Sequence, residues 1–392
     1  MTLIAGFKFK NCPILLGDLL ISGSVSEDKK LPICKEILPL NDEMENIWGD
    51  DCNYGITALK QKLFILDDTV AIAWCGCLIE AAMIIEELKK YLKEFKELRN
   101  QDIQKIMNEN KTYLKESSYI WFSVENNEVI SGCFNEINTY ESPNFDEFYA
   151  GGTGCQVFKN GEEAFGVLNK NIPDDEIVVS VVSRTLSMIL GLLNHELALQ
   201  NNAETLRDGF GGCYEIIAFY DGKFQRINGI SYIFFDGYLD DENINISTPR
   251  TLLKSEYDDN SNLIITRVDL EDADKSKIFD VTGLLRVENY KEILVKEFEN
   301  SKNISEKEDS PDFISGKILV SPFVCLVFNH AWLGRPHFSS LIIKKENTQD
   351  MLDELKLCVI NKRAVYYKPS EIFREKIENF VRKSIDLELQ KN

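Results

Sequence analysis

The order of strand-like and helical segments over residues 2–228 constrains the fold of this chain most. Apolar, β-forming runs recur in pairs, and segments with helical spacing follow in pairs. The expected strands are 2–9, 13–21, 61–66, 69–75, 118–124, 128–135, 213–220 and 224–228, with a further strand at 148–154 that ends in a glycine-rich turn. The expected helices are 78–97, 101–116, 155–168 and 173–202. This order predicts an α+β fold, a four-layer αββα sandwich in which helices cover two packed antiparallel sheets.

Turn and breaker residues divide the chain further. Asn126-Asn127 and Asp221-Gly222 have the residue types that type I′ hairpin turns require. Residues 23–58 carry charges and prolines without strand or helix periodicity, which predicts an inserted lid. From about residue 245 onward the pattern changes to strand-like runs with polar breaks and a closing helix. We therefore expect a first domain over 1–245 and a C-terminal α/β module of unknown role over 246–392.

The strong negative charge of the chain argues against nucleic-acid binding. The 392 residues include 64 Asp and Glu against 44 Lys and Arg, a formal net charge of −20, and such a surface repels a phosphate backbone. No basic segment followed by an apolar core opens the chain, so we expect no signal peptide. The most apolar long stretch, 177–199, carries Arg184, His195 and Glu196, which favours a buried helix over a membrane span. A cytoplasmic protein that binds neither nucleic acid nor a membrane is expected.

Cysteine and histidine give little support to a metal or a cofactor. The ten cysteines form no Cys-x-x-Cys pair. They are typical of reduced, buried, small apolar residues, Cys75 and Cys77 included. Of the three histidines, His330 and His337 could form a small site, although a histidine beside an apolar run is more often a structural contact. We expect no metal and no cofactor.

Several short segments carry a family resemblance. Thr2 opens the run Thr-Leu-Ile-Ala-Gly-Phe-Lys-Phe, and Asp18 follows Thr2 by sixteen residues. Lys62 precedes Gly76 by fourteen residues, and Gly152-Thr153-Gly154 forms a later glycine-rich turn. In order and spacing, these residues resemble the proteasome β-subunits and their bacterial relatives, which are N-terminal-nucleophile hydrolases.

This resemblance implies a cofactor-free threonine hydrolase that cleaves peptide or other amide bonds through an acyl-enzyme ester. It implies that Thr2 is the nucleophile and that Asp18 and Lys62 form a charged pair that activates Thr2. It also implies that the Gly76 amide binds the oxyanion and that Thr153 supplies an auxiliary hydroxyl. A threonine hydroxyl needs a base, which the threonine's own α-amine, with an ordinary pKa of about 7.7–8, supplies. The activity therefore requires removal of Met1. Because relatives assemble into rings, a homo-oligomer is also expected.

Two departures from the family pattern keep other functions open. The segment 23–58 lengthens the interval between Asp18 and Lys62. The run Arg207-Asp208-Gly209-Phe210-Gly211-Gly212 is similar to the family's Arg-Asp-x-x-Ser-Gly-Gly, but it is one residue shorter and lacks the serine. One alternative is therefore a catalytically silent proteasome-like scaffold or interaction protein. A second alternative is a small-molecule amidohydrolase, redirected by the lid and the C-terminal module.

Overall fold

The computed structural model divides the chain into two compact units. Unit 1 comprises Met1–Ile227 and unit 2 begins at Asn228, so the division falls before the expected residue 245. The residues that the structure describes are 2–24, 54–164, 168, 170–197, 205, 208–240, 243–270, 284–295, 323–332, 335–344, 358–360, 364–366, 375, 379 and 382. The greater part of the expected lid thus lies outside the described residues. Its two described ends pair as strands, β3 (Leu20–Ser24) and β4 (Tyr54–Leu59).

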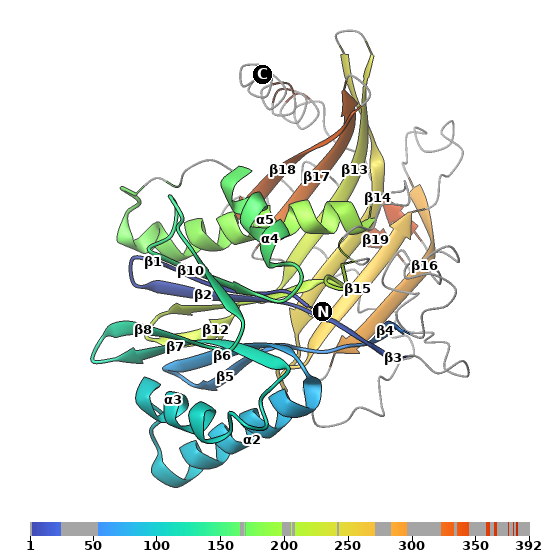
Figure 1. The fold of residues 1–392 in the computed structure, drawn as a ribbon. Coiled ribbons are helices and arrows are strands. Elements are labelled where there is room, and N and C mark those ends of the chain that lie inside the picture. The colour runs from blue at the N-terminus through green and yellow to red at the C-terminus, as the bar shows by residue number, and fades with distance from the viewer. Residues whose placement is uncertain are drawn as a thin grey trace. The chain divides into compact units, whose positions relative to one another are not determined.

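Unit 1 has mixed α and β structure built on antiparallel sheets (Figure 1), which confirms the α+β class. One sheet has the strand order β12-β11-β2-β1-β10-β9, and another has the order β5-β6-β7-β8. The first sheet consists of β1 (Ile4–Phe9), β2 (Cys12–Asp18), β9 (Ile137–Tyr140), β10 (Glu147–Gly151), β11 (Tyr214–Tyr220) and β12 (Lys223–Arg226). The second consists of β5 (Leu63–Asp67), β6 (Val70–Gly76), β7 (Ser117–Glu125) and β8 (Glu128–Phe134).

Tight turns join neighbouring strands where the sequence predicts them. Asn126 and Asn127 connect β7 to β8 with φ values of 52° and 66°. Asp221 and Gly222 connect β11 to β12 with φ values of 52° and 77°. Positive φ at both central residues is the type I′ geometry, whose twist matches that of the flanking strands. The strand β9 was not expected, because four residues are too few to show a period-2 pattern.

In the described part of unit 1, these sheets are flanked by the helices α2 (Leu78–Phe95), α3 (Asn100–Glu109), α4 (Cys155–Ala164) and α5 (Ile177–Leu197). The expected helix 101–116 is too long, because the chain turns after α3 through a hydrogen bond from Tyr113 N to Asn110 O of 2.8 Å. The segment Asp174–Asn194 is apolar and long enough to cross a membrane by length and composition alone. However, 61% of its most apolar window is buried inside the structure, as in the core helix of a globular unit.

Apolar side chains fill the space between the two sheets and beneath the helices. Ile4 and Leu15 of the first sheet pack with Ala73, Ile120 and Phe122 of the second in one buried cluster. A separate cluster joins the other face of the second sheet to α2 and α3. On the first sheet, α5 contacts β2 and β11, and α4 contacts β10. Each fully buried large side chain contributes about 1.5–3 kcal/mol to folding, so this packing holds the strand ends that carry the site.

The described part of unit 2 is an eight-stranded mixed sheet in the order β18-β17-β13-β14-β15-β16-β20-β19. Its strands are β13 (Ile230–Asp240), β14 (Asn243–Tyr257), β15 (Leu263–Leu270), β16 (Leu284–Val295), β17 (Phe323–Trp332), β18 (Arg335–Lys344), β19 (Cys358–Ile360) and β20 (Ala364–Tyr366). β13 and β17 run parallel, and the other neighbours run antiparallel. The register of β17 and β18 places His330 opposite His337. Most of the expected closing helix lies outside the described residues.

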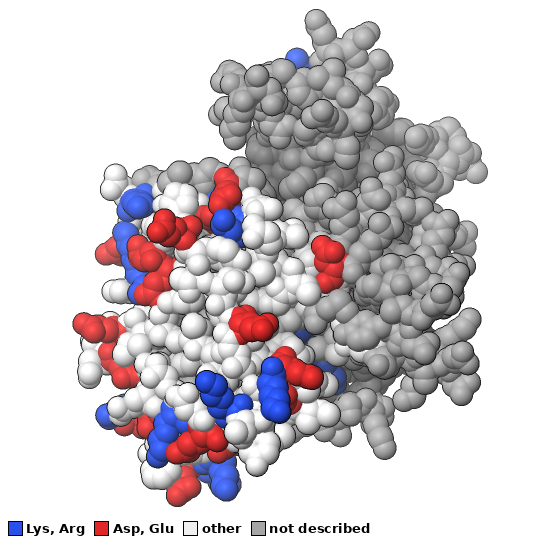
Figure 2. Space-filling model, viewed as in Figure 1, with Lys and Arg blue, Asp and Glu red and all other residues white. Residues whose placement is uncertain are grey.

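Charged residues of both signs are intermixed on the visible face of unit 1. Figure 2 shows Lys and Arg among Asp and Glu over α2 and α3, and a largely uncharged region between these helices and α4. The net negative charge of the chain is therefore not gathered into one acidic patch on the described surface of this face.

Candidate active site

Thr2 lies just before β1, where the end of β2 brings Asp18 beside it. The Thr2 hydroxyl donates a hydrogen bond of 2.6 Å to Asp18 Oδ1, and the Leu3 amide donates one of 2.9 Å to the same oxygen. The Asp18 amide in turn donates to the Leu3 carbonyl at 3.0 Å. The sixteen-residue spacing follows from the β1–β2 hairpin, whose register pairs Ile4 with Gly17.

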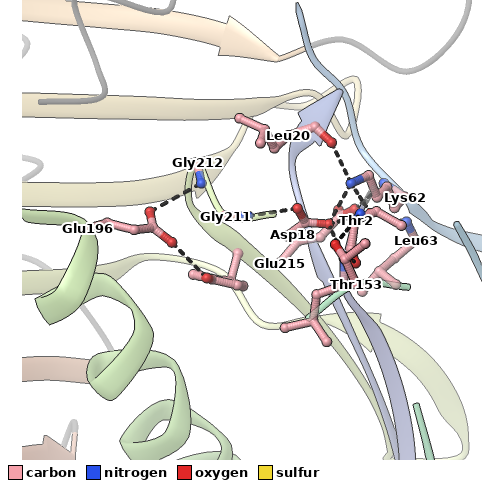
Figure 3. Close-up of polar contacts among 12 residues, drawn as sticks. Thr2, Asp18, Leu20, Lys62, Leu63, Thr153, Glu196, Gly211, Gly212 and Glu215 are labelled. Carbon is pink, nitrogen blue, oxygen red and sulfur yellow. Dashed lines mark hydrogen bonds and ion pairs between the residues drawn. The ribbon is translucent and has the colours of Figure 1, made fainter. Parts of the chain in front are cut away.

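Lys62 completes a buried polar triad with Thr2 and Asp18 (Figure 3). Its ammonium donates to Thr2 Oγ1, to Asp18 Oδ1 and, at 2.6 Å, to the Leu20 carbonyl. These three acceptors match the three protons of an ammonium group, so its orientation is fully determined. Lys62 and Asp18 are completely buried. Burial lowers the pKa of Lys62, and the Asp18 carboxylate opposes that shift.

The expected strand 61–66 includes Lys62, but in the structure Lys62 lies outside the strand. β5 begins at Leu63, and Lys62 belongs to the connection that follows β4. The apolar run that follows Lys62 in sequence is the true strand. Gly17 of β2 lies against this connection: a Cβ placed on Gly17 would lie 3.4 Å from Lys62 Cβ, at ordinary contact distance.

The glycine-rich turn after β10 encloses the backbone of Thr2. Thr153 Oγ1 accepts a hydrogen bond of 3.3 Å from the Thr2 backbone nitrogen, and the Gly154 amide donates to the Thr2 carbonyl at 3.2 Å. Gly152 has φ +84°, and a Cβ at this position would lie 2.1 Å from the Thr2 carbonyl oxygen. Glycine at 152 is therefore required for the close approach. Thr153 itself is exposed, so the turn connects the buried Thr2 to the surface.

Gly76 ends β6 near the same strand ends. A Cβ placed on Gly151, the last residue of β10, would lie 3.3 Å from Cys75 Sγ, which puts the neighbour of Gly76 against this turn. Gly76 is exposed and has φ +97°. Within the described part of the chain, no hydrogen bond joins Gly76 to Thr2, Asp18, Lys62 or Thr153. The structure thus joins four of the five expected residues by hydrogen bonds, whereas Gly76 is linked to them through its neighbour Cys75.

Gly76→Ala is expected to lower the free energy of unfolding by more than about 2 kcal/mol. The added methyl would lie 1.8 Å from the Glu116 carbonyl oxygen, and the positive φ adds strain of about 1–3 kcal/mol. Gly161→Ala in α4 is the matched control, because a Cβ there meets nothing within 4 Å and alanine favours a helix by about 1 kcal/mol. Urea denaturation of both variants measures the difference. Equal stability of the two would contradict the geometry at Gly76.

Behind the triad lies a second buried carboxyl that the sequence did not indicate, Glu196 of α5. The Gly211 amide donates to Asp18 Oδ2 at 2.8 Å, and the next amide, Gly212, donates to Glu196 Oε2 at 3.1 Å. The Tyr214 hydroxyl donates to Glu196 Oε1 at 2.7 Å. Figure 3 shows Glu196 and Asp18 on the two sides of this turn. Gly211 has φ +119°, and its Cβ would lie 2.3 Å from Glu196 Oε1, so the expected Arg-Asp-like motif contributes backbone to the site.

Asp208, the acidic residue of that motif, is exposed. Arg207 lies outside the described residues. The motif lacks the family's serine. Its described contact with the triad is made by the Gly211–Gly212 turn, whose amides donate to Asp18 and to Glu196.

Glu196 is expected to make stability fall as the pH rises from about 4.5 to 7. Burial raises the pKa of Glu196 from 4.5 to about 7. The folded protein therefore keeps a proton that the unfolded chain releases in this window, and unfolding becomes easier as the pH rises. The difference amounts to about 3 kcal/mol. Glu196→Gln cannot titrate, so denaturation at pH 4.5 and 7.5 should show a smaller loss for this variant than for the natural protein. Parallel losses would contradict the prediction.

The two cysteines that flank Gly76 are a candidate nucleophile, Cys75, and a candidate metal ligand, Cys77. Cys75 is buried and its thiol pKa is raised to about 12 by desolvation, which makes it a poor nucleophile. Among the described cysteines, Cys133 is exposed and Cys77 and Cys155 are half-buried, contrary to the expectation that the cysteines are buried. The ligand atoms of Cys77, Glu80 and Glu116 lie within 4.8 Å of one another and could hold a metal ion. Glu80 already accepts hydrogen bonds from Ser117 and the Glu116 amide.

No family model matches this chain, and no curated protein is similar to it at a significant level.

Proposed function

We propose that unit 1 is a four-layer αββα sandwich of the N-terminal-nucleophile hydrolase class and that Thr2 is its nucleophile. The layer order is supported by the shared core of the two sheets, with α2 and α3 packed on one and α4 and α5 on the other. The proposal that Thr2 is the nucleophile rests on one observation: Thr2, Asp18 and Lys62 form a buried, hydrogen-bonded triad.

The proposed reaction is acyl transfer from an amide to Thr2 and then to water. After Met1 is removed, the Thr2 α-amine takes the hydroxyl proton while Oγ1 forms a bond to the substrate carbonyl carbon. The Lys62 ammonium stabilises negative charge on Oγ1, and Asp18 keeps this ammonium charged and in place. The C–N bond then breaks and the leaving amine takes the proton. Water, deprotonated by the same α-amine, then attacks the ester carbon. The bond from this carbon to Oγ1 breaks, and Oγ1 takes the proton back from the α-amine, which restores Thr2 and releases the acid.

Two exposed residues define where the substrate would approach. Gly76 and Thr153 both reach the surface, whereas Thr2 is only 2% exposed. The Gly76 amide is the proposed donor to the oxyanion of the tetrahedral intermediate, a role in which loss of one donor costs about 2.7–4 kcal/mol. The Thr153 hydroxyl accepts from the nitrogen of Thr2 and would orient the α-amine. The substrate class proposed is a peptide or another amide.

A catalytically silent scaffold is the second candidate, and two observations favour it. The Thr2 hydroxyl is buried and bonded to both Asp18 and Lys62, while Asp208 is exposed. In this function the triad serves to hold the start of β1 in place.

Intact mass and capture of Thr2 separate the two candidates. A hydrolase requires a mass that lacks Met1. It also requires stoichiometric modification of Thr2 by a peptide epoxyketone, which reacts with a hydroxyl and the adjacent amine together. A scaffold predicts no modification at any pH. Retention of Met1 in the purified full-length protein would exclude the threonine mechanism, since a peptide nitrogen is not a base.

A further inference from the structure

The backbone of Lys62 is held by a side chain from the opposite sheet. Lys62 lies in the connection between β4 and β5, where the regular ladder of β5 has not yet begun. Its amide donates to Glu215 Oε1 at 2.5 Å, and the following amide, that of Leu63, donates to the same oxygen at 2.8 Å. On the other side, the Lys62 carbonyl accepts from the Trp74 amide at 3.1 Å. The Glu215 carboxylate thus accepts the backbone hydrogen bonds that a neighbouring strand would accept in a regular sheet.

Glu215 is itself fixed on three sides. It is completely buried on β11, and Arg226 of β12 donates to its second oxygen at 3.1 Å. The Gln61 amide group donates to that second oxygen at 3.4 Å. Arg226 also donates to the Leu63 carbonyl at 3.2 Å, so the ion pair and the connection form one network. A carboxylate with ionic and amide donors binds more tightly than a neutral acceptor would.

The place of Glu215 in the sheet explains why it reaches Lys62. In the β2–β11 register, Glu215 lies opposite Gly17 and Tyr214 lies opposite Asp18. A Cβ on Gly17 would lie 3.1 Å from the Leu63 side chain, so glycine at this position lets the start of β5 pack closely on β2. Asp18 of β2 accepts a hydrogen bond from the Lys62 ammonium. Glu215, which lies opposite the preceding residue of β2, Gly17, accepts one from the Lys62 backbone amide.

We propose that Glu215 is a positioning residue, which holds the backbone of Lys62 so that the Lys62 ammonium reaches Thr2 and Asp18. This inference rests on the proposed function for its effect on the reaction, but the placement of Lys62 can be tested by itself. Glu215 does not touch the reacting atoms. Its carboxylate sets the position of a group whose displacement by about 1 Å can cost about a hundredfold in rate.

The test uses Glu215→Gln in the full-length protein, with Glu162→Gln as the matched control. Glu162 is an equally buried carboxyl of α4 that accepts from Ser142 and Asn144, outside the triad and its direct contacts. The first readout is acetylation of Lys62 by acetic anhydride, followed by peptide mass spectrometry. The buried amine of the natural protein and of the control should react slowly, and that of Glu215→Gln at least about tenfold faster, because local opening exposes it.

The second readout is the rate of Thr2 capture by the peptide epoxyketone as a function of pH. Glu215→Gln should react about 10- to 100-fold more slowly, with its midpoint at higher pH. The shift follows because a displaced ammonium no longer lowers the pKa of the Thr2 amine. A merely structural role would change the thermal midpoint but not this pH midpoint. Arg226→Gln removes the cation that holds Glu215 and the hydrogen bond to the Leu63 carbonyl but leaves the Glu215 carboxylate in place, so this second variant should show both changes to a smaller degree.

The two readouts separate failure of this inference from failure of the proposed function. If Lys62 stays protected and Thr2 capture is unchanged in both variants, Glu215 does not position Lys62. If Lys62 loses its protection but the natural protein never captures the epoxyketone, the positioning stands and the hydrolase proposal fails.

Discussion

Thr2→Ala is expected to reduce amide hydrolysis by about a thousandfold or more, because it removes the only proposed nucleophile. The change should leave the fold intact, since Asp18 and Lys62 still contact each other at 2.5 Å. Thr2→Ser retains the hydroxyl and should retain most of the activity. Hydrolysis of a peptide library and of small amides, measured for all variants, gives the rate and the substrate class together.

Thr185→Ala is the matched control for the loss of a buried threonine hydroxyl. Thr185 is fully buried in α5, where its hydroxyl donates to the Val181 carbonyl at 2.9 Å and not to the triad. Activity of this variant should match that of the natural protein. Undiminished hydrolysis by Thr2→Ala would show that another group performs the reaction.

Lys62→Met is expected to abolish Thr2 capture and to destabilise the fold by about 3 kcal/mol or more. Removing one partner of a buried ion pair leaves the other charge without compensation, which costs about 3–5 kcal/mol. The Asp18 carboxylate keeps donors from Thr2, Leu3 and Gly211, which places the cost at the lower end of that range. Capture of the epoxyketone and guanidinium denaturation measure the two effects.

Two further variants test whether this cost comes from the unpaired charge. Lys8→Met breaks a partly exposed pair with Glu147 and should cost no more than about 1 kcal/mol. The double variant Lys62→Met/Asp18→Asn removes both charges, so it should be more stable than Lys62→Met alone. If the double variant is the less stable of the two, the stability of the site does not depend on the buried ion pair.

Local sequence patterns were sufficient where the structure is formed by neighbours along the chain. The hairpin turns at Asn126-Asn127 and Asp221-Gly222 depend on residue types that tolerate positive φ, and these are visible in the sequence. Thr2 and Asp18 are brought together by a single hairpin, so the contact that the family resemblance implies needs only local structure. Helix ends were less accurate, as at α3, because the turn that ends a helix involves weak and common residue types.

The sequence by itself predicted the α+β class and most of the strands, and its family resemblance singled out Thr2, Asp18, Lys62 and Thr153. Only the tertiary structure decided what surrounds them, because the partners come from distant strands and helices. Glu215 contacts Lys62 across 153 residues, and Gly211 contacts Asp18 across 193. The sequence around a buried glutamate on a strand or helix does not indicate which residue the glutamate will contact. Its role follows from desolvation, since a carboxylate at such depth must be matched by donors that only the folded chain assembles.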